Sequence, residues 1–237
     1  MEDSQKIRVK DYRNIVILTG AGISVASGIA PFRGPGGLWT DKDIEECATA
    51  QALRRNPQKV WEAFSFVRQK ANEVAPNAAH LALAELEKRT QNTWILTQNI
   101  DGLHQKAGSQ NVVELHGTIH RSQCCRYCTP PFEDRETKFH KCQHCGAPLR
   151  YDIVLFNESL DPEVIATSYD LLERADLFLV VGTSGIVYPA AGFVPIARRA
   201  GARVIIVNLE ELDYRGGSIE QINGKAEVIL PHLFDYN

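Results

Sequence analysis

The segment Asn14–Ser24, NIVILTGAGIS, decides the fold of this chain. Its β-branched apolar run predicts a buried strand, and Gly20 and Gly22 predict a tight turn into a helix start. In such a turn the backbone N–H groups can face a pyrophosphate. The dinucleotide pattern G-x-G-x-x-G is incomplete, because Val25 stands at its third glycine position. A strand-to-helix turn without a ligand would use the same glycines, so the segment alone leaves the ligand open.

Two later segments repeat this pattern of an apolar run that ends in small or polar residues. Asp176–Ser184, DLFLVVGTS, ends in a glycine-hydroxyl turn, and Arg203–Glu210, RVIIVNLE, ends in Asn208 and Glu210. Glycine and hydroxyl groups at a strand end suit phosphate or ribose contacts, and a carboxylate there commonly accepts a ribose hydroxyl. Together these segments predict an α/β fold with a Rossmann-like, doubly wound parallel sheet.

Polar residues also follow two shorter strand candidates, 93–96 and 112–115. The first is followed by Gln98, Asn99, Asp101 and His104, and the second by His116. Ligands bind at the carboxyl ends of parallel strands, so we expect these side chains to line one cleft, with His116 as an acid–base group on its rim. The alternative is that His116 is a hydrogen-bonded core histidine and Asn99 a turn residue.

Composition places the chain among ordinary globular proteins. It has 237 residues, 44% apolar and 23% charged, with a net charge of −3. An acidic balance argues against direct nucleic-acid binding, which favours a basic excess. No apolar run has the length of a membrane span, and the charged start MEDSQKIRVKDYRN resembles no secretion signal. We therefore expect a cytoplasmic protein with reduced thiols.

Five of the six cysteines fall within 22 residues and predict a metal site. Cys125, Cys128, Cys142 and Cys145 form two C-x-x-C pairs at zinc-ribbon spacing, and a closed set of four thiolates indicates one structural zinc ion. Cys124 is an alternative first ligand, because C-x-x-x-C to Cys128 would also reach. Cys125 is favoured here because its spacing mirrors the second pair. His140 and His144 are adjacent spare ligands, and disulfides are the alternative to a metal.

The motifs occur in the order seen in sirtuins, which are NAD-dependent protein lysine deacylases. They are GAGIS at 20–24, the segment 27–34, TQNIDGLH at 97–104, ELHG at 114–117, the two cysteine pairs, GTS at 182–184 and NLE at 208–210. The chain resembles this family from about residue 14 to 231. The ordered set is specific, although no single motif is decisive.

The resemblance implies three parts with NAD and acyl-lysine meeting between them. The Rossmann-like domain would comprise 1–40, 89–120 and 153–237, the helical module 41–88 and the zinc-binding module 121–152. It implies His116 and Asn99 as catalytic residues. The implied cofactor-binding residues are Gly20, Ala21, Gly22, Ser24, Phe32, Arg33, Gln98, Asn99, Ile100, Asp101, Gly182, Thr183, Ser184, Asn208, Leu209, Glu210 and Ala226. The implied substrate-binding residues are Phe64, Val67, Val154, Phe156 and Val187.

The implied reaction removes nicotinamide from ribose C1′ and transfers the acyl group to ADP-ribose. His116 would act as general base toward a ribose hydroxyl, a task that suits a histidine titrating near neutrality. The substrate peptide would add as a strand between 154–156 and 185–188. The nearest alternative function is mono-ADP-ribosyl transfer to protein from the same NAD site. A dehydrogenase and a zinc-ribbon nucleic-acid module are disfavoured by the incomplete glycine pattern and the acidic charge.

Three departures from the family pattern bear on specificity. Ala30-Pro31 replaces the usual order in the loop 27–34, and VLFNE at 154–158 replaces V-W-F-G-E. Members that remove succinyl or malonyl groups carry a Tyr-x-x-Arg pair after the helix tryptophan, where this chain has Phe64 and Val67. Arg68 stands one residue late and should point elsewhere, since a helix turns about 100° per residue. The sequence therefore predicts a preference for acetyl or longer neutral acyl groups.

Overall fold

The computed structural model describes residues 6–31, 46–184, 190–212 and 219–237. Its largest sheet has six parallel strands in the order β10-β9-β8-β2-β3-β4. In chain order they are β2 (Ile15–Thr19), β3 (Thr93–Thr97), β4 (Val112–Glu114), β8 (Leu177–Val181), β9 (Arg203–Asn208) and β10 (Glu220–Asn223). This is the 3-2-1-4-5-6 order of a nucleotide-binding sheet, with its switch point between β2 and β8. The prediction of a doubly wound parallel sheet is confirmed.

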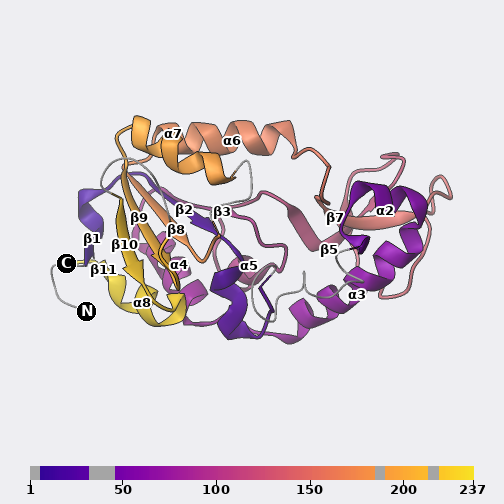
Figure 1. The fold of residues 1–237 in the computed structure, drawn as a ribbon, viewed down its shortest axis with the longest axis horizontal. Coiled ribbons are helices and arrows are strands. Elements are labelled where there is room, and N and C mark those ends of the chain that lie inside the picture. Colours follow the sequence, from indigo (N-terminus) through magenta and orange to yellow (C-terminus); the bar gives the residue numbers. More distant parts are fainter. Residues whose placement is uncertain (1–5, 32–45, 185–189, 213–218) are drawn as a thin grey trace.

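Helices cover both faces of this sheet because its strands are apolar on both sides. Ile15 and Ile17 of β2 face a core shared with α4 (Ala78–Arg89) and α8 (Ala226–Leu233). Val16 and Leu18, one residue out of phase, face α6 (Pro162–Glu173) and α7 (Phe193–Arg199). Figure 1 shows α6 and α7 on one side of the sheet and α4 and α8 on the other.

A second, antiparallel sheet has the order β6-β5-β7. Its strands are β5 (Gly117–Cys124), β6 (Phe132–Glu133) and β7 (Leu149–Ile153), and α2 (Ala50–Arg55) and α3 (Pro57–Glu73) lie beside it. Trp61, Phe64 and Tyr151 belong to the third core between α3 and this sheet. The segment expected as one helical module is therefore divided in its packing, because α4 contributes to the core of the large sheet. The domain boundaries stay a prediction.

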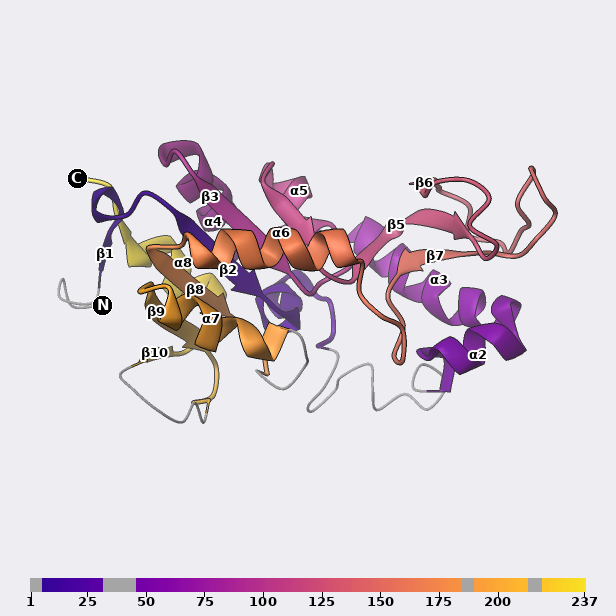
Figure 2. The same cartoon turned by 90° about the horizontal axis from the view of Figure 1, so that it is seen from above.

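The molecule is elongated, with the two sheets at opposite ends (Figures 1 and 2). Both termini lie at the large-sheet end, where β1 (Ile7–Arg8) pairs with β11 (Phe234–Asp235). The shorter elements are the 3-10 stretches η2 (Val9–Asp11), η3 (Ala21–Ser27) and η5 (Ala190–Gly192), and helix α5 (Leu103–Ala107). Among the described residues, the helices are too short or too polar to cross a membrane.

Candidate active site and metal centre

The glycine turn after β2 meets the turn after β8 at the switch point of the sheet. Gly22 N donates to Gly182 O at 2.8 Å. A Cβ on Gly20 would lie 2.7 Å from Gly182 O, and one on Gly182 would lie 2.6 Å from Ile23 N. Close backbone approach therefore requires glycine at these positions. The expected helix start is a 3-10 stretch, and Val25 on it is 47% exposed, so the third glycine of the pattern is not needed.

Side chains from η3 and from the segment after β3 form one hydrogen-bonded cluster. Asn99 Nδ2 donates to Gly20 O at 3.1 Å and to Ser24 Oγ at 3.2 Å. Ser24 Oγ donates to Asp101 Oδ2 at 2.7 Å, and Leu103 N donates to Asp101 Oδ1 at 2.9 Å. Burial raises the pKa of Asp101, and these two hydrogen bonds oppose that shift. The cluster fixes an amide and a carboxyl group beside the glycine turn.

Two further histidines lie beside this cluster. The sequence did not single out His80, and the expectation that His104 lines the cleft is wrong, because its side chain is buried with 1% exposure. His80 Nε2 lies 3.4 Å from Ser24 Oγ, and its ring centroid lies 5.0 Å from that of His104. The available signal for His80 was its position three residues after Asn77, the N-cap of α4, because the two form a capping box. His104 was visible only as one more polar residue after β3.

His116 follows β4 and is partly exposed rather than turned into a core. Its Nδ1 donates to Gln98 O at 2.8 Å, which leaves Nε2 as the unprotonated nitrogen of the neutral ring. Burial lowers the pKa of His116, and the Gln98 carbonyl partly opposes this. A neutral imidazole with a bare Nε2 can accept a proton near neutral pH.

Most of the other described cofactor candidates lie in the segments that follow the strand ends. Gln98 Nε2 donates to Thr183 Oγ1 at 3.0 Å, which joins the ends of β3 and β8. Asn208 ends β9 and donates to Glu210 O at 3.1 Å, while Leu209 is 67% exposed. Ala21, Ile100 and Ser184 lie in the same strand-end segments, and Ala226 begins α8. Phe32, Arg33 and Val187 lie outside the described residues.

The metal-binding prediction is wrong at one residue. The sulfurs of Cys124, Cys128, Cys142 and Cys145 all lie within 4.8 Å of one another, and Cys125 is outside this set. Cys124 is the last residue of β5 and fully buried, and Tyr127 N donates to Cys124 O at 2.8 Å, so the tight turn starts at Cys124. Strand alternation then turns Cys125 to the other side. The assumption of two equal C-x-x-C pairs was wrong because three residues separate Cys124 from Cys128, whereas two separate Cys142 from Cys145.

The four sulfurs fit a zinc ion. The separations of Cys128 Sγ from the sulfurs of Cys124, Cys142 and Cys145 are 3.3, 3.5 and 3.2 Å. A tetrahedron with Zn–S bonds of about 2.3 Å has edges of about 3.8 Å, so a small expansion would admit the ion. His140 and His144 are outside the cluster. His140 contacts Asp134 instead, at 3.4 Å.

Of the described substrate candidates, Phe64, Val67 and Phe156 lie where α3 meets the small sheet. Phe64 is buried in the third core, and Val67 and Phe156 pack against that core. Val154 N donates to His116 O at 2.9 Å, so the predicted substrate segment 154–156 is hydrogen-bonded to the backbone of the candidate base. Phe156 N and O pair with Ala48 O and Ala50 N at 2.8 and 2.9 Å, which engages the Phe156 backbone within the chain.

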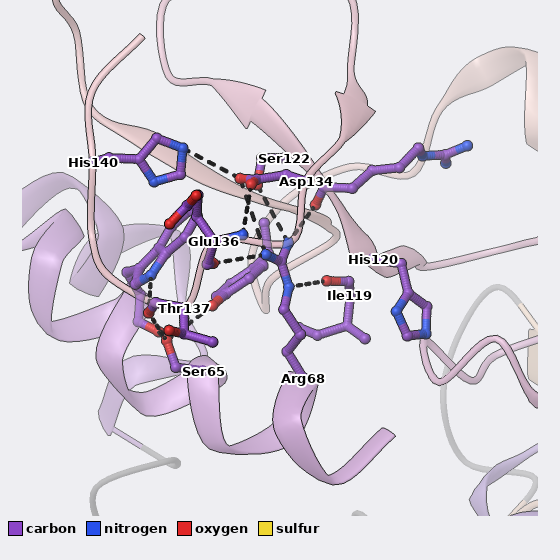
Figure 3. A network of polar contacts seen from close by, with 12 residues as sticks. Ser65, Arg68, Ile119, His120, Ser122, Asp134, Glu136, Thr137 and His140 are labelled. Carbon is purple, nitrogen blue, oxygen red and sulfur yellow. Dashed lines mark hydrogen bonds and ion pairs between the residues drawn. The ribbon is translucent and has the colours of Figure 1, made fainter. Parts of the chain in front are cut away.

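Arg68 does not take the direction of Val67, as its position one residue later on α3 predicted. Its guanidinium is 1% exposed and donates to Ile119 O at 2.7 Å and Glu136 O at 3.0 Å (Figure 3). It lies 4.0 Å from Asp134 Oδ2 and 4.3 Å above the Tyr151 ring. The Arg68 guanidinium is therefore held by groups of the small sheet and of the loop that precedes Cys142.

Comparison with known proteins identifies the family. The family model described as "Sir2 family" matches residues 20–189. The chain belongs to the Sir2 family. Among curated relatives, an NAD-dependent protein deacylase of Aquifex aeolicus is 44% identical over 94% of this chain and 95% of its own length. A deacylase of the same description from Thermococcus kodakarensis is 44% identical over 93% of this chain and 90% of its own length.

Solved Sir2 structures share the fold. The S24A mutant of a Sir2 homologue in complex with ADP ribose has a TM-score of 0.91 and 36% identity, covering 98% of this chain and 95% of its own. A Sir2 homolog–NAD complex has a TM-score of 0.88 and 38% identity, covering 95% and 89%. A Sir2 H116A structure with deacetylated p53 peptide and 3′-O-acetyl ADP ribose has a TM-score of 0.84 and 32% identity, covering 94% and 92%.

Proposed function

We propose that this chain is an NAD-dependent protein lysine deacylase that prefers acetyl and other neutral acyl groups. The observation that carries the proposal is the placement of His116. Its ring is anchored by Gln98 O and partly exposed, and it follows the strand next to β3, whose end carries Asn99 and Asp101. Membership of the Sir2 family, whose matched relatives are named NAD-dependent protein deacylases, supports the same reading.

The strand-end residues suit NAD as cosubstrate. The glycine turns after β2 and β8 bring backbone close together at the switch point, where dinucleotides bind in this fold class. Gly20, Gly22, Ser24, Gly182, Thr183 and Ser184 would hold the phosphates and adenosine ribose, and Gln98, Asn99 and Asp101 the nicotinamide half. NAD would supply a ribose C1′ from which nicotinamide can depart. Asn99, held by Gly20 and Ser24, would then orient the ribose face presented to the acyl oxygen.

His116 would act as the general base of the acyl transfer. Its Nδ1–H is held by Gln98 O, so Nε2 is the atom that would take the proton of a ribose hydroxyl. The carbonyl of Gln98 would also favour the imidazolium that forms, because it accepts from Nδ1–H in both protonation states. The products would be free lysine, nicotinamide and acyl-ADP-ribose.

The acyl preference follows from the residues on α3. Phe64 and Val67 stand where carboxylate-binding members carry tyrosine and arginine, and Arg68 is committed to Ile119, Glu136 and Asp134. Burying an acyl carboxylate against Phe and Val without a cation would be costly. We therefore expect faster removal of acetyl than of succinyl groups from matched lysine peptides.

The test is an NAD-dependent assay on a mixed set of acetyl-lysine peptides, run with the wild type and with His116→Ala. We expect the wild type to release free lysine and nicotinamide in equal amounts, and the variant to lose both. Faster turnover of succinyl-lysine than of acetyl-lysine peptides would contradict the acyl preference. Adenine-labelled NAD whose label ends on protein instead of in acyl-ADP-ribose would identify the chain as a mono-ADP-ribosyltransferase.

A further inference from the structure

A chain of buried hydrogen bonds runs beneath the proposed active site. His104 Nε2 and Thr19 Oγ1 are 2.9 Å apart, and Thr19 Oγ1 donates to Thr97 Oγ1 at 2.9 Å. Thr97 Oγ1 also accepts from Asn99 N at 3.1 Å. Thr19 and Thr97 end the adjacent strands β2 and β3, and all three side chains are almost fully buried. The chain therefore connects His104 to the backbone of Asn99.

The donors in this chain fix the protonation of His104. Thr19 has one hydroxyl proton, and it is used on Thr97, so Thr19 Oγ1 can only accept from His104. His104 Nε2 must carry the proton, and Nδ1 is then a bare acceptor. This Nδ1 is fully buried and has no hydrogen-bond partner among the described residues. An unpaired buried polar atom costs free energy, so packing alone would favour an apolar side chain here.

The His104 ring also contacts the His80 ring, which in turn approaches Ser24. His80 Nδ1 accepts from Asn77 N at 3.4 Å, at the start of α4, so His80 Nε2 is the donor toward Ser24 Oγ. The His104 ring packs edge-on against the His80 ring. Ser24 Oγ thus accepts from His80 and from Asn99, and its own proton is directed to Asp101.

We infer that His104 is a positioning residue that holds Asn99, through Thr19 and Thr97, and Ser24, through His80, in the geometry needed for NAD cleavage. The inference rests on the proposed function. His104 would donate one hydrogen bond at the start of the chain and remain neutral throughout the reaction. It would touch neither NAD nor the acyl-lysine.

Thr97→Val is the most conservative test, because it removes only the hydroxyl that accepts from Asn99 N. Thr93→Val is its matched control. Thr93 lies at the other end of β3, is 1% exposed and forms a hydroxyl–hydroxyl contact with Thr90 at 2.6 Å. We expect Thr97→Val to lower the rate of nicotinamide release by about tenfold or more at saturating acetyl-lysine peptide, and Thr93→Val to leave it unchanged. The two variants should lose similar thermal stability.

His104 itself is tested by His104→Gln, which can keep a donor near the Nε2 position, and His104→Leu, which cannot. We expect Gln to retain more of kcat than Leu, with KM for the peptide unchanged in both. In a cycle with Thr19→Val, the double variant should be no slower than either single variant, because both break the same chain.

Three results would overturn the inference while the deacylase proposal stands. One is an active Thr97→Val enzyme, another is equal loss of rate in Thr97→Val and Thr93→Val, and the third is full additivity of His104→Leu with Thr19→Val. Failure of the function itself looks different, because the wild type would then release no nicotinamide with any acetyl-lysine peptide.

Discussion

Burial lowers the pKa of three histidines near the proposed site, but only one of them can exchange protons with a ligand. His80 and His104 are fully enclosed, with pKa values lowered to about 4 and about 3. His116 is partly exposed, and its pKa is lowered by burial against the opposing effect of Gln98 O. Burial of the same residue type therefore yields two neutral structural rings and one candidate base.

The lowered pKa of His116 predicts the acid limb of the pH–rate profile. A base is active when unprotonated, and a lowered pKa keeps it unprotonated to lower pH. We expect kcat/KM for an acetyl-lysine peptide to fall with a midpoint below the ordinary histidine value of 6.5. A midpoint at or above 6.5, measured on wild type across pH 5 to 8, would contradict this assignment.

His80 and His104 predict a loss of stability in mild acid. Both pKa values are lower in the folded chain than the ordinary 6.5, so the unfolded chain binds more protons between pH 6.5 and about 4. Stability is therefore full above pH 6.5 and falls with decreasing pH, by at most about 1.4 kcal/mol per pH unit for each histidine. Urea unfolding from pH 7 to 5 measures this slope. His104→Gln should reduce the slope of the unfolding free energy against pH by the equivalent of up to one bound proton. An unchanged slope would show that unfolding does not change the protonation of His104.

At the scale of the element, the turn at the end of β5 selects which cysteine joins the metal site. Cys124 and Cys125 are adjacent, yet only Cys124 Sγ lies with the other three sulfurs. Cys125 is half-buried outside this cluster, where burial raises the pKa of its thiol against the opposing effect of Arg150. The two positions offer a matched pair of variants in one turn.

We predict that Cys124→Ser abolishes stoichiometric zinc binding and that Cys125→Ser retains it. The measurement is metal content per chain after purification, together with thermal unfolding before and after a chelator. A serine at 124 leaves three thiolates and a weaker ligand, and structural zinc sites need four ligands for their folding contribution. Equal zinc content in both variants would contradict the assignment of Cys124, rather than Cys125, as the zinc ligand.

Arg68 shows how α3 is attached to the loop before Cys142. Its guanidinium contacts Glu136 O and Asp134, while Trp61 Nε1 and Ser65 Oγ both donate to Thr137 O at 3.0 Å. Figure 3 shows Ser65 and Arg68 of the helix meeting Asp134, Glu136 and Thr137 of the loop. The helix that carries Phe64 is thus fixed to the cysteine-rich part of the chain.

Arg68→Met should therefore destabilise the fold without changing acyl preference. Removing one partner of a buried pair leaves Asp134 without its guanidinium, a change that typically costs about 3–5 kcal/mol. Urea unfolding measures the loss, and the ratio of acetyl- to succinyl-lysine turnover measures the preference. A selective change in succinyl turnover would place Arg68 in the acyl pocket instead.

Much of this arrangement could be predicted from the sequence, and the failures have local physical causes. The runs Ile15–Thr19 and Leu177–Val181 are apolar on both faces, which is typical of strands in a parallel sheet with helices on each side. The ordering of motifs then predicted where the site lies, at the ends of these strands. The choice between Cys124 and Cys125 depended on backbone direction at the end of β5. The contact of His80 with Ser24 could not be predicted, because the fold brings the start of α4 next to Ser24 and the local sequence gives no sign of this approach.

At the scale of the whole molecule, the chain crosses between its two sheets beside the proposed base. β4 ends at Glu114 and β5 begins at Gly117, with His116 between them. Arg121 spans the crossing, with Nε 2.9 Å from Asp152 Oδ2 and Nη2 3.4 Å from Glu114 Oε2. The large sheet carries the residues proposed to bind NAD, and the small sheet leads into the predicted acyl-lysine residues 154–156. The geometry of this crossing therefore sets how the two proposed half-sites meet.

Gly117 is the residue that this crossing constrains most. Its φ is 72°, and a Cβ there would lie 2.1 Å from Asp152 O of β7. Gly108 has a φ of 102° with open space around its Cβ position, so Gly108→Ala carries the backbone strain without the clash. The φ strain alone should cost roughly 1–2 kcal/mol. The clash in Gly117→Ala must in addition separate β5 from β7, at the end of the small sheet next to His116.

We therefore predict that Gly117→Ala loses deacylation by a larger factor than it loses NAD binding, while Gly108→Ala keeps both. The reason is that the strand ends at the glycine turns belong to the large sheet alone, whereas the proposed acyl transfer would require His116 and the predicted substrate segment 154–156 together. Calorimetric titration with NAD and turnover of an acetyl-lysine peptide, each measured on both variants, separate the two effects. If Gly117→Ala lost NAD binding and turnover to the same extent, the crossing would be part of the nucleotide site rather than the joint between two halves.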